Sequence, residues 1–358
     1  MRGQGHSNMA NSDSERRVEP LEGVTLVIPG RNAERTIRRC LDAAVARLGQ
    51  DGLERIVFVN DGSTDRTAEI VGTYPVTLLA HQGGGPGAAR NIGWRAATTP
   101  LVWFIDADCV VEPDALRLLL PHLEAAEVVG VGGSYGNVES DSLLATIIHE
   151  EIRERHLSMN GKVDFLGGFN VVYRRDALES VGGFDEERFN GPGAPGAEDA
   201  DLSYRLSARG HQMRHEPDAL VGHYHPTRLG RYLRSQRLHG FWATRLYARH
   251  GDRAGSNSYS SFLDHIQPAI AMVATAALPG LAWPQLRLVA LTPFAALGLL
   301  QLPMAGRLLR RTRDWRMLGY VPLGMVRAAA RGVGMTHAVL RATIDRLGRP
   351  GDKIGLRA

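Results

Sequence analysis

Short apolar runs alternate with helical stretches through the first third of this 358-residue chain, and this alternation restricts the fold more than any other feature. The runs cover residues 24–28, 55–59, 76–80 and 101–105, and helical apolar spacing lies between them, as over residues 33–48. Strands that are apolar along both faces are typical of a parallel sheet with helices packed on each side. The sequence therefore predicts an α/β fold with a doubly wound, mostly parallel sheet.

Polar clusters follow three of these strands, at residues 29–34 (PGRNAE), 60–65 (NDGSTD) and 106–108 (DAD). The carboxyl ends of parallel strands meet at one edge of an open sheet, where α/β proteins bind their ligands. One aspartate after a strand is usually a helix cap or a turn residue. Three such loops at the same edge predict a binding site.

The last of these clusters has the pattern of a divalent-metal site. Alternate residues of an extended segment point the same way, so the carboxylates of Asp106 and Asp108 are expected to face one cation. Oxygen ligands of this kind suit Mg²⁺ or Mn²⁺, which complete their coordination with phosphate oxygens. A solvated turn with a capping aspartate is the alternative interpretation.

A glycine-rich loop, residues 83–91, leads into a helix and carries Arg90 in its first turns. It lacks the lysine of a P-loop and the spacing of a dinucleotide fingerprint, which disfavours a nucleoside triphosphatase and a dehydrogenase. A guanidinium at this place is suited to approach a diphosphate.

Six motifs stand in order over about residues 24–225: Pro29 to Glu34, Asp61 to Asp65, Ala89 to Gly93, Asp106 to Asp108, Gly182 to Asp185 and the pair Glu198-Asp199. The ordered set resembles the P-x-x-N-x-E, D-G-S-x-D, A-R-N-x-G, D-x-D, G-G-F-D and E-D motifs of family 2 glycosyltransferases of the GT-A fold. The resemblance implies hexosyl transfer from a nucleotide-diphosphate sugar, with UDP favoured as the nucleotide and Mn²⁺ or Mg²⁺ as cofactor.

The resemblance also implies a role for individual residues. Asp199 is expected to be the catalytic base, and Asp106, Asp108 and His223 are expected to hold the metal. The acceptor side of the cleft is expected to include Gly168, Phe169 and Glu198. The donor-binding residues implied are Pro29, Asn32, Glu34, Asp61, Arg90, Asp106 and Ala107. Arg31 stands where relatives often carry an aromatic residue, which leaves the nucleotide base open.

The chemistry supports this division of roles. Displacing a nucleoside diphosphate from an anomeric carbon leaves negative charge that a divalent ion stabilises. The attacking hydroxyl must lose a proton, so a carboxylate is needed on the side away from the metal. Direct attack assisted by Asp199 implies inversion. Plain charge stabilisation of a helix N-terminus remains the alternative for Glu198-Asp199, a surface histidine for His223, and a tight glycine turn for residues 167–170.

The rear of the chain has a different character. Residues 266–286 and 288–306 carry no charge, and Arg287 alone separates them. Each segment is about as long as the roughly 20 residues that span a bilayer. Arginines flank both ends, which would keep both ends in the cytosol. Two buried helices of a soluble domain are the alternative.

The charged residues are also distributed unevenly between the front and the rear of the chain. From residue 227 onward there are 20 Lys and Arg against five Asp and Glu, although the whole chain is only +4. Arginines recur every three residues between leucines at Arg228, Arg231, Arg234 and Arg237, which predicts a basic helix facing anionic lipid headgroups or a lipid diphosphate acceptor. A solvated helix face is the alternative. The Q-x-x-R-W motif of processive synthases is not matched at residues 236–240, which argues against polymerisation.

We therefore predict a non-processive, inverting, metal-dependent glycosyltransferase at the cell membrane, with its catalytic domain in the cytoplasm and a lipid-linked or surface-glycan acceptor. No signal peptide is visible, two cysteines suit a reducing compartment, and nucleic-acid binding is disfavoured. A sugar-1-phosphate nucleotidyltransferase and a catalytically silent scaffold are the alternatives. The expected organisation is a disordered leader (1–22), a GT-A domain (23–226), a basic amphipathic connector (227–264), an apolar helical hairpin (265–306) and a basic amphipathic tail (307–358).

Overall fold

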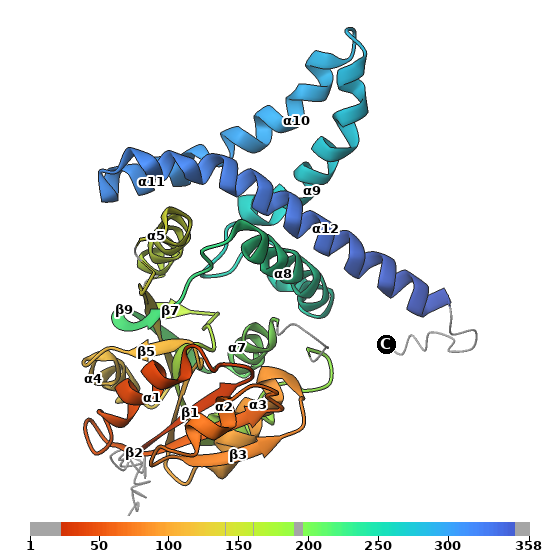
Figure 1. Cartoon of the computed structure of the whole chain (residues 1–358). Helices are drawn as coiled ribbons and strands as arrows, with labels where there is room; N and C mark the ends of the chain where they lie inside the picture. Colours follow the sequence, from red (N-terminus) through yellow and green to blue (C-terminus); the bar gives the residue numbers. More distant parts are fainter. Residues whose placement is uncertain (1–22, 140, 160, 190–195, 348–358) are drawn as a thin grey trace, which may run out of the picture.

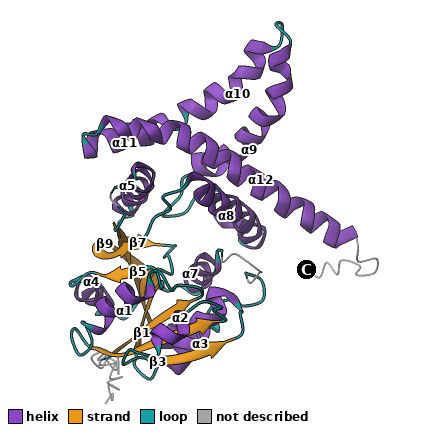
Figure 2. Ribbon diagram, in the orientation of Figure 1, coloured by secondary structure: helices purple, strands orange, loops and turns teal. Residues whose placement is uncertain are grey.

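A computed structural model describes residues 23–139, 141–159, 161–189 and 196–347. The expected leader (1–22) and the end of the expected tail (348–358) lie outside the described residues. A sheet covered by helices forms one part of the molecule, and long helices form the other (Figures 1 and 2).

The sheet is mixed, with its first four strands parallel. Its order is β3-β2-β1-β4-β8-β6-β9-β5, and the short β7 pairs with β9. Strands β8, β5 and β7 run antiparallel to their neighbours. The strands are β1 (Val24–Gly30), β2 (Leu53–Asp61), β3 (Thr77–His81), β4 (Leu101–Ile105), β5 (Cys109–Val111), β6 (Val128–Asn137), β7 (Lys162–Val163), β8 (Asn170–Arg174) and β9 (Gln212–His223). The predicted α/β fold with a mostly parallel central sheet is confirmed.

Both faces of the sheet are buried at its central strands, because successive residues of these strands enter different cores, whereas the edge strand β3 has no buried residue. In β1, Leu26 and Ile28 pack in one core, and Val27 packs in the other. The first core includes residues of α1 (Ile37–Val45) and α4 (Ala115–Leu119). The second includes residues of α3 (Gly85–Ala96), α6 (Arg175–Val181) and α7 (Glu198–Ala208). The short helix α2 (Thr67–Val71) follows β2. The uninterrupted apolar strands are explained by this double cover.

Strand direction brings several loops to one edge of the sheet. Strands β1, β2 and β4 are parallel and end at this edge. Antiparallel β8 begins there, since Asn170 pairs with Ile105. The ends of β6 and β9 lie at the same edge, where Asn137 pairs with His223.

Helix α5 (Leu143–Ser158), which precedes β7, and helix α8 (Leu229–Arg249) lie between the sheet and the last helices of the chain (Figure 1). The other helices of the rear half are α9 (Phe262–Ala277), α10 (Arg287–Leu299), α11 (Leu302–Thr312) and α12 (Tyr320–Leu347). Helix α11 is joined to α5 by ion pairs, with Arg311 contacting Glu150 at 2.5 Å and Glu154 at 3.0 Å. Helices α9 and α10 form a hairpin that projects away from α12 and from the sheet (Figure 1).

The second apolar segment is not one continuous helix. Helix α10 ends at Leu299, and α11 begins at Leu302 with Pro303 in its first turn. A proline restricts the residue before it and has no N–H to donate, so it favours a helix start at this point. Within the expected tail (307–358), residues 307–312 complete α11, and Tyr320–Leu347 form the single 28-residue helix α12.

Candidate active site

The loops after β1 and β2 are tied to each other. Asn32 has a left-handed backbone (φ 53°) and accepts a hydrogen bond from the Thr64 N–H at 2.8 Å, while its own N–H donates to Ser63 at 3.0 Å. The Glu34 N–H donates to Asp65 at 3.2 Å. The two loops therefore form one wall, and Pro29 lies buried at its base.

Asp61 supports the glycine-rich loop. Its carboxylate accepts hydrogen bonds from the N–H groups of Gly84 (2.8 Å) and Gly85 (2.9 Å), and it contacts His81 at 2.8 Å. The Asp61 side chain is buried by these contacts. Asp61 therefore stabilises the turn before α3. Its role in recognising the nucleotide base stays a prediction.

Arg90 lies at the centre of the site, between two carboxylates. Its guanidinium donates to Asp106 at 2.7 Å and to Glu198 at 2.8 Å, and it is buried against the ring of Phe184. A Cβ at Gly168 would lie 2.9 Å from the Arg90 Cζ, so this glycine leaves room for the guanidinium. Sequence reasoning placed Arg90 near the donor but did not pair it with Glu198.

This cluster holds more negative than positive charge. Burial and the nearby charge of Asp199 raise the pKa of Glu198 to about 7, although Arg90 opposes the shift. Burial also raises the pKa of Asp106, against the effect of Arg90. One guanidinium cannot offset three carboxylates in a buried place, which explains both directions.

Asp199 follows Glu198 at the start of α7 and lies beside the glycine segment before β8. It accepts a hydrogen bond from the Gly168 N–H at 3.2 Å. Phe169 stacks on Tyr135 with the ring centroids 3.6 Å apart. Tyr135, at the end of β6, lines the site, and no sequence motif pointed to it.

Asp106, Asp108 and His223, which are expected to hold the metal, all line the cavity. His223 Nε2 lies 3.6 Å from Asp108, whose side chain is 45% exposed. Among the described residues, no group of three or more His, Cys, Asp or Glu side chains is arranged so that it could hold a metal ion. Two carboxylates and one imidazole are ligand types that suit a divalent ion whose remaining ligands are phosphate oxygens and water. The chemistry of these residues therefore suits the expected metal, although the described residues form no ready-made site of three ligands.

All the predicted site residues line one cavity of about 2160 Å³. This cavity continues from the loops at the sheet edge to helices α5, α8, α9 and α12. It includes Pro29, Asn32, Glu34, Asp61, Arg90, Asp106, Ala107, Asp108, Gly168, Phe169, Glu198, Asp199 and His223. Their convergence is a structural fact, while the roles assigned to them remain predictions.

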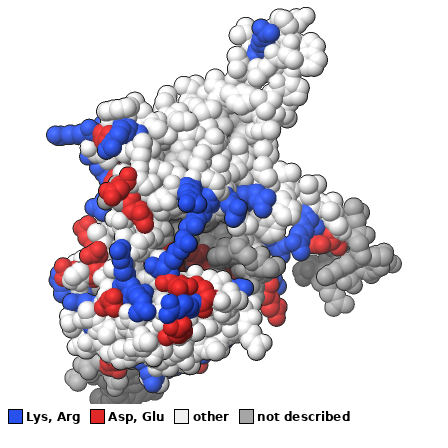
Figure 3. Space-filling view, in the orientation of Figure 1, with Lys and Arg blue, Asp and Glu red and all other residues white. Residues whose placement is uncertain are grey.

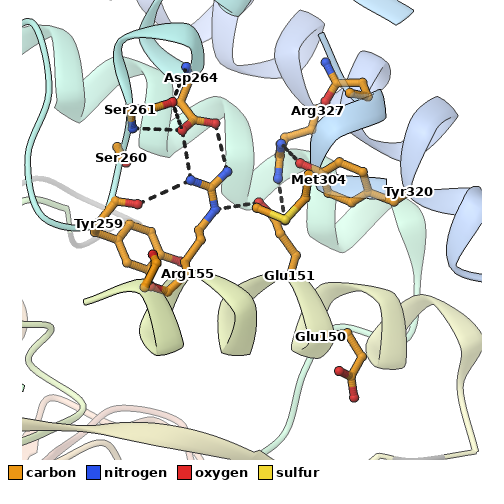
Figure 4. Close-up of polar contacts among 12 residues, drawn as sticks. Glu150, Glu151, Arg155, Tyr259, Ser260, Ser261, Asp264, Met304, Tyr320 and Arg327 are labelled. Carbon is orange, nitrogen blue, oxygen red and sulfur yellow. Dashed lines mark hydrogen bonds and ion pairs between the residues drawn. The ribbon is translucent and has the colours of Figure 1, made fainter. Parts of the chain in front are cut away.

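The far end of the cavity holds a buried ionic network that the sequence did not indicate (Figure 4). Arg155 of α5 donates to Glu151 and to Asp264 of α9, each at 2.8 Å. Glu151 also accepts from Arg327 of α12. These residues come from three distant segments, so no local pattern could have brought them together.

Comparison with known proteins agrees with this geometry. Residues 25–182 match the model of the family described as "Glycosyl transferase family 2". A pre-mycofactocin glycosyltransferase of Mycobacterium tuberculosis is 33% identical over 241 residues, which cover 64% of this chain and 48% of that protein. A poly-beta-1,6-N-acetyl-D-glucosamine synthase of Staphylococcus aureus is 24% identical, over 62% of this chain and 54% of that protein. The chain thus spans about half the length of these curated relatives.

The fold also matches a solved structure. A mannosyltransferase from Pyrobaculum calidifontis, in complex with GDP-Man and Mn²⁺, superposes with a TM-score of 0.50 at 22% identity, covering 85% of this chain and 86% of that one. At this identity the likeness concerns the fold. Together with the ordered motifs, the family match identifies residues 25–182 as a family 2 glycosyltransferase domain, and its fold is of the GT-A type.

Proposed function

We propose that the protein is an inverting, metal-dependent glycosyltransferase that moves a sugar from a nucleotide-diphosphate donor, with UDP favoured, to a hydroxyl of a lipid-linked or surface-glycan acceptor. The observation that carries the proposal is that Asp106, Asp108, His223 and Asp199 line one cavity, where Arg90 bonds both Asp106 and Glu198, the residue before Asp199. Family membership favours glycosyl over nucleotidyl transfer.

The chain's own residues would act as follows. The loops around Asn32 and Asp61 hold the nucleoside, and Asp106, Asp108 and His223 hold a Mn²⁺ or Mg²⁺ ion. Such an ion supplies positive charge for the departing diphosphate. Arg90 adds a second positive charge near the diphosphate. Asp199 takes the proton of the acceptor hydroxyl as that oxygen attacks the anomeric carbon from the opposite side, which inverts its configuration.

We also propose that the hairpin attaches the enzyme to the cytoplasmic face of the cell membrane. Among the described residues, two helical segments are long and apolar enough to cross a membrane, Phe262–Ala282 and Arg287–Thr312. The projecting hairpin has one basic patch on an otherwise uncharged surface (Figure 3). Arginines on α8 and α11 flank the apolar part and favour a cytosolic position of both ends.

A thermal-shift panel tests the donor site. UDP, GDP, dTDP and CMP are compared with and without Mn²⁺, using the wild type and Asp108→Asn. We expect a metal-dependent shift for one nucleoside diphosphate, and loss of its metal dependence in the variant. Metal-independent shifts for every nucleotide would contradict the metal assignment.

Product analysis then tests the reaction. Incubation with the matching nucleotide sugar and a membrane lipid extract is expected to release the nucleoside diphosphate and to label a lipid-extractable product. Transfer confined to small water-soluble acceptors in a membrane-free fraction would contradict the acceptor class.

A further inference from the structure

The cavity contains more space than the donor-binding edge of the sheet. Beyond Asp199 it continues into a chamber between α5, α8, α9 and α12, which we call the inner chamber. Its walls include Arg231, Gln236 and Trp242 of α8 and Arg327 and Arg331 of α12. Because it adjoins Asp199, the inner chamber is where an acceptor would lie under the function proposed above.

Most of the buried charge beside this chamber is neutralised within the protein. Arg155 forms a two-pronged ion pair with Asp264, at 2.8 and 3.0 Å, and also contacts Glu151 (Figure 4). Arg327 donates to Glu151 and, at 2.7 Å, to the hydroxyl of Tyr320. Two carboxylates are therefore already used by two arginines, with good geometry on each side.

Arg331 is different. It lies one helical turn after Arg327 and donates through Nε to the amide oxygen of Gln236 at 2.8 Å. Within the described part of the chain no carboxylate forms an ion pair with it. Burial and the neighbouring charge of Arg327 lower the pKa of Arg331. Because Gln236 is neutral, the positive charge of the partly buried Arg331 is not compensated by a negative group in the protein.

Other polar atoms in the cavity wall also lack a partner. The indole Nε1 of Trp242 and the Nδ1 of His156 are buried, and neither has a hydrogen-bond partner among the described residues. Both residues line the cavity. Because both atoms are enclosed within the wall, they do not face the open chamber and are not contact points for a ligand.

From these observations we infer that the inner chamber is the acceptor site and that Arg331, oriented by Gln236, binds a phosphate group of the acceptor. The inference rests on the proposed function and adds the chemical class of the acceptor, a phosphate ester. The arginines of the chamber walls, Arg155, Arg231, Arg327 and Arg331, outnumber the acids Glu151 and Asp264, which agrees with an anionic ligand.

The test measures binding of phosphate probes to the full chain in detergent. Farnesyl phosphate and glycerol 3-phosphate are compared with their neutral counterparts, farnesol and glycerol. Arg331→Gln is expected to weaken binding of the preferred phosphate probe by about 10- to 100-fold, the effect of losing one charged hydrogen bond. Preference for farnesyl phosphate would identify a lipid phosphate, and preference for glycerol 3-phosphate a water-soluble one.

Two further variants make the result specific. Arg341→Gln removes an exposed arginine from the same helix and is expected to leave probe binding unchanged. Arg331→Lys keeps the charge and is expected to retain most of the affinity. Equal binding by Arg331→Gln and the wild type, or no advantage of phosphates over neutral probes, would overturn the inference. So would an Arg331→Lys variant as weak as Arg331→Gln.

The donor site is measured in the same samples. A metal-dependent nucleotide shift that persists in Arg331→Gln shows that the fold and the donor site are intact, so a lost phosphate affinity is then assigned to the inner chamber. Absence of every nucleotide shift in the wild type would instead count against the proposed function.

Discussion

At the scale of single residues, the site is organised by Arg90, which joins two carboxylates far apart in the chain. Asp106 comes from the end of β4 and Glu198 from the start of α7, and both accept hydrogen bonds from the same guanidinium. Arg90 thereby fixes the beginning of α7, and with it the position of Asp199, relative to the loop of Asp106 and Asp108. The proposed metal side and base side are linked through one side chain.

Asp199→Asn tests the base. We expect transfer to fall by about 100- to 10,000-fold, the usual contribution of a general base, because an amide does not take the acceptor's proton. Nucleotide binding with Mn²⁺ should be unchanged, as measured by thermal shift. Glu179→Gln, an exposed residue of α6, is the control. A variant that keeps most of its transfer activity would refute the assignment.

Glu198→Gln tests the raised pKa. Because the folded-state pKa of about 7 is above the ordinary value of 4.5, Glu198 contributes stability below about pH 4.5 that is lost as the pH rises through 7. The variant, which keeps an oxygen for Arg90, should therefore gain stability relative to the wild type between pH 5.5 and 8.

The measurement is the Tm of both proteins across that range without added metal. A full shift of this size corresponds to about 3 kcal/mol as an upper bound. A difference in Tm that stays constant with pH would show that Glu198 does not titrate there.

At the scale of elements, the crossing of α8 and α12 is set by glycines. A Cβ on Gly240 would collide with the carbonyl oxygen of Arg331, and one on Gly334 with that of Arg237. At both glycines the backbone of the other helix occupies the position that a side chain would take, so the two helices are in direct backbone contact. This approach places Gln236 against Arg331 and thus forms one wall of the inner chamber.

Gly334→Ala should therefore separate the two helices. Overpacking of this kind costs about 1–3 kcal/mol, and we expect lower thermal stability and faster proteolysis in α12. Gly230→Ala, on α8 with open space around it, is the matched control and should be neutral or slightly stabilising. Equal stability of the two variants would mean that the crossing is not tight.

At the scale of the whole molecule, the break between α10 and α11 bears on how deeply the proposed membrane hairpin enters, because the segment Arg287–Thr312 is long enough to cross as a whole but α10 alone is not. Helix α10 has 13 residues, about 20 Å of helix, against a hydrocarbon core of about 30 Å. Helix α11, which follows it, is held to α5 of the catalytic domain by Arg307 and Arg311. We therefore expect a hairpin that dips into one leaflet.

Labelling of Gln285→Cys at the tip tests this expectation. Both native cysteines, Cys40 and Cys109, are buried and should stay unlabelled. In membrane vesicles of either orientation, a membrane-impermeant maleimide should not reach the tip until detergent is added. Labelling from the outer face of intact cells would instead show a spanning hairpin.

A charge on the hairpin should also weaken membrane binding. The Leu288 side chain on α10 is 80% exposed. Leu288→Glu is expected to reduce the vesicle-bound fraction at least tenfold in a flotation assay, because a charge in the apolar layer costs a few kcal/mol. Leu78→Glu, on β3 of the catalytic sheet, is the control. Unchanged flotation would place the membrane contact elsewhere.

Much of the fold follows from local patterns. Apolar runs without polar alternation predicted strands buried on both faces, and β1, β4 and residues 56–59 of β2 are buried in this way. The edge strand β3 is not, since none of its residues is buried. Helix ends were less well predicted, since the stretch from residue 33 begins with a turn and becomes α1 only at Ile37. The turn before α1 depends on a tertiary contact, the hydrogen bond from the Ala33 N–H to the Thr67 hydroxyl. The spacing of apolar residues carries no information about such a contact.

The site divides in the same way, and the reason is physical. Motif order and the rule that parallel strands end at one edge were sufficient to predict that Asp61, Asp106 and Asp108 lie at one site. Strand positions follow from local hydrophobicity, and helical connections between strands indicate that the strands are parallel. The pairing of Arg90 with Glu198, the stacking of Tyr135 and the lone position of Arg331 depend on how helices far apart in the chain pack together. Packing is decided by the shapes of whole surfaces, such as the glycine crossing of α8 and α12, so the tertiary structure alone settled these contacts.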